Sequence, residues 1–135
     1  MIVGIDIGTT ITKAVAIENG RVLNKVKTRA VDAITSATGA FGKMLLENSI
    51  RMPEIEKIIM TGVGASQITG DLFGIPTTKT DEIRAVGIGG IFLAGREHII
   101  ITNIGTGTLI VKATKDSISH IGGSGVGGGT ILGLS

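Results

Sequence analysis

The sequence predicts an α/β fold whose central strands are covered on both faces. Of the 135 residues, 42% are hydrophobic, and Val, Ile and Leu occur in short runs separated by 22 glycines. The chain holds three Phe and no Trp or Tyr, so we expect an aliphatic core. The glycines gather in turns instead of repeating with a period, which argues against a collagen-like or low-complexity chain.

The amino-terminal part predicts a three-stranded meander. Residues 2–7 and 11–17 have the apolar patterns of two strands, and residues 21–28 form a third. Asn19-Gly20 stands between the second and third strands, and this dipeptide is the strongest short hairpin signal.

The next stretch predicts a helix over residues 32–48, because apolar side chains recur close to the helical period. After a connection containing Pro53, we expect a buried strand at 55–61, a glycine loop, and one or two helical turns at 66–73. Residues 77–79 have the pattern of a short strand.

A second helix is expected from Glu82 to about Ala94, because Thr80-Asp81-Glu82 offers a capping side chain and an acid to the positive end of the helix dipole. Its three glycines, Gly87, Gly89 and Gly90, lower helix propensity. We therefore expect them to allow close packing against a neighbouring element.

The last part repeats the plan of the first. Strands are expected at 99–102, 109–113 and 117–121, with a Gly/Thr turn between the first two, and a helix begins at 131–134. The repeat indicates two related lobes, residues 1–96 and 97–135, whose loops face each other across a cleft. Three strands and one helical turn cannot bury their own apolar face, so we expect a fragment or a lobe that another chain completes.

The composition of the chain argues against two classes of binding partner, nucleic acids and membranes. The net charge of +2 comes with no long basic run, and the lack of aromatic side chains removes stacking platforms, so no nucleic-acid partner is expected. The longest apolar tract, residues 85–95, is too short to cross a bilayer, so no membrane partner is expected. The absence of cysteine is typical of a reducing cytoplasm, which is the expected location.

The first Gly/Thr turn has the chemistry of a phosphate site. Asp6 leaves its strand where a carboxylate can hold hydrated Mg²⁺, and the backbone N–H groups of Gly8, Thr9 and Thr10 suit an anion. The alternative is a tight turn that only joins two core strands.

Four motifs together resemble the actin/hexokinase/Hsp70 ATPase superfamily and, more closely, the type II pantothenate kinases. They are Gly4-Ile5-Asp6-Ile7-Gly8-Thr9-Thr10-Ile11-Thr12-Lys13, Asp81-Glu82-Ile83, Asn103-Ile104-Gly105-Thr106-Gly107-Thr108 and Gly122-Gly123-Ser124-Gly125-Val126-Gly127-Gly128-Gly129-Thr130. The resemblance implies a ribonuclease H-like (actin-like ATPase) lobe with a mixed sheet flanked by helices. It also implies the first β-meander and glycine loop of a second similar lobe.

The resemblance further implies ATP and Mg²⁺ as cofactors and a small pantothenate-like alcohol as substrate. Asp6 would hold the metal through water, and Lys13 would lie near the transferred phosphate. The residues implied to line the nucleotide site are Asp6, Ile7, Gly8, Thr9, Thr10, Ile11, Thr12, Lys13, Thr106, Gly128, Gly129, Thr130, Ile131 and Leu132. A glycine-rich loop that leads into a helix offers N–H donors to an anion, whereas a flexible linker is the alternative for 122–130.

Glu82 aligns with the general base of the family, which takes the proton from the primary hydroxyl of the substrate. The alternative is a solvated partner of the helix dipole, and Asp81 beside it is expected to be the cap. His120 stands where the family usually carries an arginine, and it lacks the bidentate fork of arginine. This departure leaves the acceptor substrate open.

Three functions follow from these motifs. The first is a kinase that phosphorylates pantothenate or a related alcohol, expected to act as a homodimer or with a complementing chain. The second is an activator of the 2-hydroxyacyl-CoA dehydratase type, but those activators need cysteines for an iron–sulfur cluster and this sequence has none. The third is a nucleotide-binding lobe without kinase activity, such as an assembly module.

Overall fold

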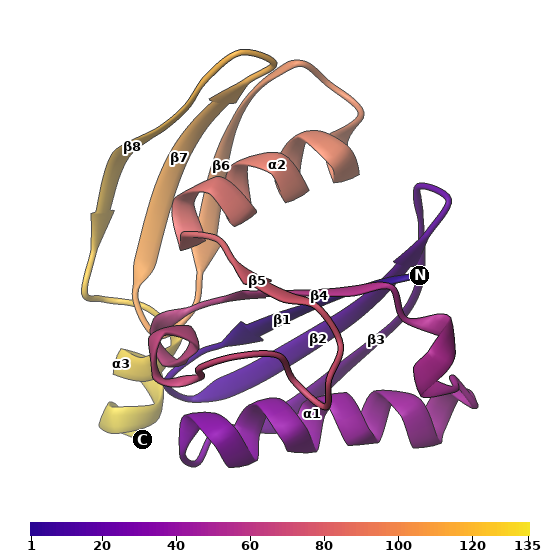
Figure 1. Cartoon of the computed structure of the whole chain (residues 1–135). Coiled ribbons are helices and arrows are strands. Elements are labelled where there is room, and N and C mark those ends of the chain that lie inside the picture. The colour runs from indigo at the N-terminus through magenta and orange to yellow at the C-terminus, as the bar shows by residue number, and fades with distance from the viewer. The chain divides into compact units, whose positions relative to one another are not determined.

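The computed structural model describes all 135 residues, which divide into two units, residues 1–80 and 81–135 (Figure 1). Each unit contains one β-sheet and one long helix. The helix that begins at Glu82 groups with the second sheet, so the boundary between the units falls at residue 80. The division into functional lobes at residue 96 stays a prediction.

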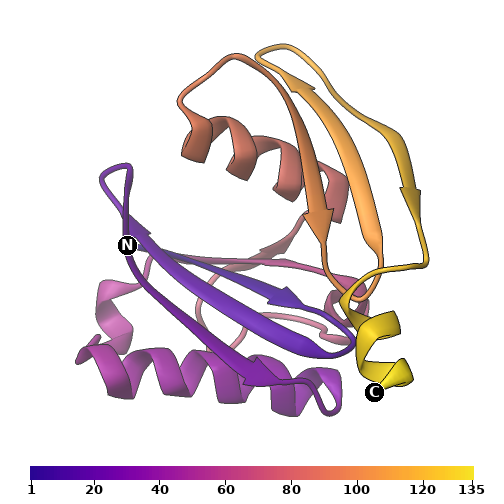
Figure 2. The ribbon, with the colours of Figure 1, turned by 180° about the vertical axis from the view of Figure 1, so that it is seen from behind.

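The sheet of the first unit is mixed and has the strand order β3-β2-β1-β4-β5. Its strands are β1 (Ile2–Ile7), β2 (Ile11–Glu18), β3 (Arg21–Arg29), β4 (Lys57–Thr61) and β5 (Thr77–Lys79). The first three form the predicted antiparallel meander, and β4 and β5 run parallel to β1 (Figure 2). Asn19 (φ 50°) and Gly20 (φ 71°) form the hairpin turn, as this dipeptide predicts.

Helix α1 (Ala33–Asn48) confirms the first predicted helix and covers one face of this sheet (Figure 1). Its N-cap is Asp32, whose side chain accepts a hydrogen bond of 2.8 Å from the backbone N–H of Thr35. The buried side of the helix consists of Ala33, Ser36, Ala37, Ala40, Phe41 and Met44. All of these residues except Ser36 join the alternate, buried side chains of β1, β2 and β4 in one continuous hydrophobic core.

Between β4 and β5 the structure differs from the sequence prediction. The 3₁₀ helix η1 (Met52–Glu54) precedes β4, and η2 (Val63–Gln67) is the only helical turn between β4 and β5, so the helical turns predicted at 66–73 are wrong beyond Gln67. Gly70, Phe73 and Gly74 all have positive φ, which ends any helix there. Phe73 instead stacks on Phe41, with ring centroids 5.5 Å apart.

The second unit holds an antiparallel three-stranded sheet, β6 (His98–Ile104), β7 (Thr108–Thr114) and β8 (Ile118–Ser124). Helix α2 (Glu82–Ala94) packs on it, and α3 (Gly128–Leu134) follows β8. A Cβ atom at Gly87 would lie 2.5 Å from Ile118 Cγ2, and one at Gly90 would clash with Ile101. The close packing predicted for the glycines of α2 is therefore confirmed at these two positions.

The glycine run near the carboxyl end is more ordered than the sequence indicates. Gly122 and Gly123 belong to β8 and pair with Ile110 and Leu109 of β7, so the strand extends past its predicted end at residue 121. Helix α3 starts inside the run, at Gly128. None of the helices of the structure is both long and apolar enough to cross a membrane.

Candidate functional site

The candidate site of the first unit is a row of three side chains across neighbouring strands. Because β1 lies between β2 and β4, Asp6 pairs in register with Lys13 on one side and with Thr61 on the other. Lys13 Nζ donates to Asp6 Oδ2 at 3.0 Å, and the two side chains are 46% and 32% exposed. A pair this exposed contributes only about 0–1 kcal/mol, so Lys13 can change partners at small cost.

Strand alternation separates the predicted site residues of this unit into two groups. Asp6 and Lys13 lie on the sheet face opposite α1, whereas the side chains of Ile7 (2% exposed) and Thr12 (0% exposed) point into the core. A ligand beside Asp6 could therefore contact only the backbone of Ile7 and Thr12. The sequence could have revealed this division, because side chains along a β-strand alternate between the two faces of the sheet.

Two glycines let the backbone approach this row. A Cβ atom at Gly62, where φ is +87°, would lie 2.6 Å from Asp6 Oδ1, so only glycine leaves room for the carboxylate. A Cβ atom at Gly8 would lie 2.6 Å from the carbonyl oxygen of Ile11, inside the β1–β2 turn. Sequence reasoning did not select Thr61 and Gly62, although the glycine loop at the end of a strand was a signal for them.

The donor set of the row fits Mg²⁺ bound together with a phosphate ligand. The structure contains no group of three or more His, Cys, Asp or Glu side chains that could hold a metal ion. Mg²⁺ usually keeps several waters and binds through one or two carboxylates plus substrate phosphates. Asp6 offers one partly exposed carboxylate, with space maintained beside Oδ1 by Gly62.

In the second unit the two glycine loops pack directly on each other. A Cβ atom at Gly127 would lie 2.7 Å from the carbonyl carbon of Gly107, and Thr108 Oγ1 donates to the carbonyl of Val126 at 2.7 Å. The backbone N–H groups of Gly128 and Gly129 donate to the carbonyls of Gly105 (2.8 Å) and Thr106 (3.2 Å). The expectation that these N–H groups are unoccupied donors for an anion is therefore wrong for this structure.

Of the remaining predicted residues of the second unit, Thr130 is half-buried and accepts a hydrogen bond from the backbone N–H of Gly127 at 3.3 Å, and the others are exposed. Glu82 is the first residue of α2, and its carboxylate makes no hydrogen bond or ion pair in the structure. Asp81 is the N-cap, as predicted, and accepts from the backbone N–H of Arg84 at 2.8 Å. Ile131 and Leu132 of α3 are exposed, and His120 lies on β8 opposite Val111 with its side chain exposed.

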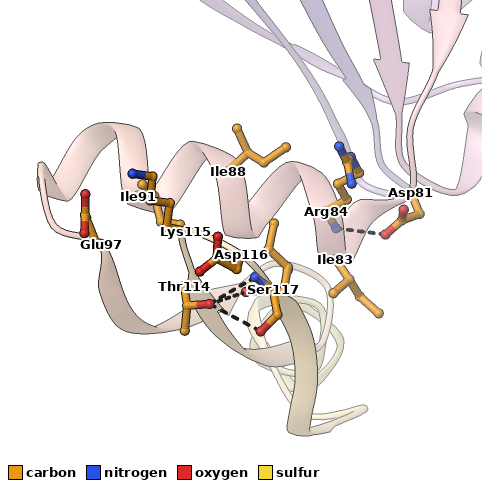
Figure 3. Close-up of a pocket in the computed structure, with 11 residues that line it drawn as sticks. Asp81, Ile83, Arg84, Ile88, Ile91, Glu97, Thr114, Lys115, Asp116 and Ser117 are labelled. Carbon is orange, nitrogen blue, oxygen red and sulfur yellow. Dashed lines mark hydrogen bonds between the residues drawn. The ribbon is translucent and has the colours of Figure 1, made fainter.

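A separate cavity of about 630 Å³ lies between α2 and the β7–β8 turn (Figure 3). Isoleucines of the helix form its apolar wall, and charged side chains surround them. Thr114 and Ser117 hydrogen-bond to each other across the turn at its edge. The lining residues are Asp81, Ile83, Arg84, Ile88, Ile91, Glu97, Thr114, Lys115, Asp116, Ser117 and Ile118. Glu82 is not among them.

Comparison with known sequences finds relatives named type II pantothenate kinase. The protein from Bacillus anthracis is 30% identical over 145 residues, which cover 98% of this chain and 47% of the relative. The protein from Staphylococcus aureus (strain USA300) is 32% identical over 140 residues, covering 99% and 48%. The chain thus spans about half the length of the curated relatives it matches. No family model matches the chain.

Solved structures share the fold at 18% identity. Component A of the (R)-2-hydroxyglutaryl-CoA dehydratase of Acidaminococcus fermentans superposes with a TM-score of 0.74 over 87% of this chain and 44% of that one. The activator of the 2-hydroxyisocaproyl-CoA dehydratase from Clostridium difficile, with bound ADPNP, gives 0.69 over 89% and 45%. A ROK family glucokinase from Streptomyces griseus, in complex with glucose and AMPPNP, gives 0.61 over 87% and 46%.

These findings confirm the resemblance and the fold class that the motifs predict. The sequence match covers nearly all of the chain, and kinases and dehydratase activators share its mixed sheet with flanking helices. The chain is similar in sequence to type II pantothenate kinases over nearly all of its length, and it shares the fold of the dehydratase activators and the ROK family glucokinase.

Proposed function

We propose that the chain is part of an ATP-dependent kinase that phosphorylates the primary hydroxyl of pantothenate or a related small alcohol, the first step of coenzyme A biosynthesis. The observation that carries this proposal is the exposed Asp6–Lys13 pair beside a glycine turn, in a sequence similar to type II pantothenate kinases. The enzyme would act in the cytoplasm, as a homodimer or with a complementing chain.

The residues of the first unit would bind the phosphates. Mg²⁺, when bound, would neutralise charge on the β- and γ-phosphates. Asp6 would hold this ion through water, as a single carboxylate usually does. Lys13, released from its weak pair with Asp6, would turn its ammonium group to the transferred phosphate. The turn residues Gly8, Thr9 and Thr10 would contact the phosphates through their backbone.

The residues of the second unit would complete the nucleotide site. Thr106 would lie in the second phosphate loop, and Gly128, Gly129, Thr130, Ile131 and Leu132 would contact the nucleotide. Because the N–H groups of Gly128 and Gly129 already donate to the neighbouring loop, these two glycines would form the site by keeping the loops close. The exposed side chains of Ile131 and Leu132 offer apolar surface to a base.

Glu82 would act as the general base. An exposed carboxylate without a protein partner can accept the proton of a primary hydroxyl as the hydroxyl oxygen attacks the γ-phosphate. The phosphorus–oxygen bond to the substrate forms, the bond to ADP breaks, and the proton stays on Glu82 Oε until solvent removes it.

The test is phosphate transfer from labelled ATP by the full-length protein, with pantothenate and pantetheine as separate acceptors. Glu82→Gln is expected to lower kcat by about 10²–10⁴-fold, because it removes the proton acceptor but keeps the shape. Glu97→Gln, an exposed glutamate of the same unit, is the matched control and should leave kcat unchanged. Transfer that is equally fast in Glu82→Gln would disprove the base assignment.

A second candidate is an ATPase without kinase activity, either like a dehydratase activator or as an assembly module. The structural likeness to the two dehydratase activators favours it. The same assay separates the two candidates, because this candidate predicts nucleotide binding or hydrolysis with no phosphate on either alcohol.

A further inference from the structure

The hydroxyl of Thr61 is one of three buried hydroxyls of the first unit that have no hydrogen-bond partner, with those of Thr12 and Thr28, and it is the one that lies beside Asp6. Its Oγ1 atom is buried and has no hydrogen-bond partner in the structure. A buried hydroxyl without a partner is unfavourable, and such groups are rare in folded proteins. Thr61 is the last residue of β4, where the strand gives way to the glycine loop. An unpaired hydroxyl at the end of a strand is therefore a candidate to donate a hydrogen bond in another state of the site, such as the ligand-bound state.

The Asp6 carboxylate, on the adjacent strand β1, is an acceptor near the Thr61 hydroxyl. β4 alternates so that Ile58 and Met60 enter the core, whereas Thr61 lies on the same face as Asp6, its partner in the parallel register. Neighbouring strands are about 4.8 Å apart, so a change of rotamer brings a threonine hydroxyl to a carboxylate on the adjacent position. In the present structure Asp6 instead accepts from Lys13, through Oδ2.

The two oxygens of Asp6 have different surroundings. Oδ2 is occupied by Lys13 Nζ at 3.0 Å, whereas Oδ1 faces the space that Gly62 leaves by having no side chain. If Lys13 turns to a phosphate, Asp6 loses its charged donor. The carboxylate would then lack the donor that now binds Oδ2, and another donor beside it would help to fix its direction toward a hydrated cation.

We propose that Thr61 is a positioning residue for Asp6. Its hydroxyl donates to the Asp6 carboxylate when Lys13 pairs with phosphate, and it holds the carboxylate in the orientation that binds the water shell of Mg²⁺. The hydroxyl that lacks a partner in this structure is thus the donor that Asp6 uses once nucleotide binds. This role rests on the proposed nucleotide site.

The test compares three variants of the full-length protein. Thr61→Val keeps the β-branched shape and removes the hydroxyl, Thr61→Ser keeps the hydroxyl, and Thr28→Val removes another buried hydroxyl without a partner from the same sheet. For each we would measure the melting temperature without ligand, and the Kd for ATP by calorimetry with Mg²⁺ and with EDTA.

Thr61→Val should melt at the same temperature as the unchanged protein or higher, because it removes an unsatisfied buried group. Its Kd for ATP with Mg²⁺ should rise about tenfold, as expected for one lost hydrogen bond to a charged group. With EDTA the difference should disappear. Thr61→Ser should bind as the unchanged protein does, and Thr28→Val should alter neither Kd.

Three results would overturn the role of Thr61 while leaving the nucleotide site in place. One is an unchanged Kd in Thr61→Val with Mg²⁺. Another is an equal loss of affinity with EDTA, which would mean that the hydroxyl does not act through the metal. The third is an equal loss in Thr28→Val, which would indicate a general structural effect. If the unchanged protein bound no ATP under either condition, the nucleotide site itself would be wrong, and the role of Thr61 would fall with it.

Discussion

The two units of this chain achieve close packing in different ways. In the first unit, buried side chains of the sheet and of α1 form one continuous aliphatic core around Phe41 and Met44. In the second unit only Val111 and Ala113 are buried hydrophobic side chains, and Ile100 and Ile104 remain 68% and 67% exposed. There, close contact comes from glycines that bring backbone against side chain or against backbone. The first unit therefore depends mainly on side-chain volume, although Gly62 and Gly64 also allow close contacts there, whereas the second unit depends mainly on glycines.

The largest expected effect comes from opening the core of the first unit. Phe41→Ala removes a fully buried ring and its stacking on Phe73, and should lower the free energy of unfolding by about 3–5 kcal/mol. Val111→Ala, in the second unit, removes two methylene equivalents and should cost about 1.5 kcal/mol. Denaturant unfolding measures both values, and amide hydrogen exchange locates the loss.

Amide hydrogen exchange also provides the result that would contradict the prediction for Phe41→Ala. Phe41→Ala should accelerate exchange mainly in β1, β2, β4 and α1. Equal acceleration in β6 and β7 would show that the two sheets unfold as one cooperative block, which would remove the contrast between them.

A medium effect is expected at the glycines of α2. Gly87→Ala places a methyl group against Ile118, and should destabilise the protein by about 1–3 kcal/mol through overpacking. Gly89→Ala, two residues along the same helix, meets nothing within 4 Å and should stabilise it by up to about 1 kcal/mol through helix propensity. Melting temperatures that move in the same direction for both variants would contradict the role of Gly87 in packing.

The smallest effect concerns the pH dependence of the first unit. Hydrogen bonds from the side chain and backbone of Thr35 hold the pKa of Asp32 below its ordinary value. The capping stabilisation is therefore present above the ordinary pKa of the carboxyl group, and is lost as pH falls through the lowered pKa. Thermal melts from neutral to acidic pH should show a smaller acid-induced loss for Asp32→Asn, which keeps a capping oxygen but does not titrate.

Asp32→Ala serves as the comparison for this variant. It should be less stable than Asp32→Asn at neutral pH, because it removes the cap altogether. If both variants kept the full acid-induced loss of the unchanged protein, Asp32 would not be its source.

Local signals made much of the fold predictable. Asn19-Gly20 specifies a hairpin turn through its positive φ angles, and Asp32 and Asp81 specify helix starts through their capping oxygens. Each of these signals acts within a few residues. The strands of both meanders could be read in the same way, because each lies next in sequence to its partner.

The errors arise where distant pairing decides the structure. Gly122 and Gly123 have the composition of a loop, but hydrogen bonding to β7 makes them strand residues. Ile68, Leu72 and Ile75 have helical spacing, but all three are buried without a helix, since positive φ angles at Gly70, Phe73 and Gly74 turn the chain between them.

The candidate site residues show the same difference between local and distant pairing. Asp6 and Lys13 could be linked from the sequence, because one hairpin joins their strands. Thr61 could not be placed beside Asp6, because the parallel register of β1 and β4 connects residues far apart in the chain. The buried side chain of Thr12 was predictable from alternation, yet the motif resemblance included it with its exposed neighbours.

The glycine loops of the second unit also provide a position at which a fluorescent dye can be attached. Gly107 and Gly127 cannot accept a side chain, whereas at Gly105 and Gly125, in the same two loops, an added Cβ atom would meet nothing within 4 Å. The sequence has no cysteine, so a single cysteine at Gly125 would be the only thiol of these 135 residues. A dye attached there would report on this glycine loop directly, with no background labelling from this part of the protein.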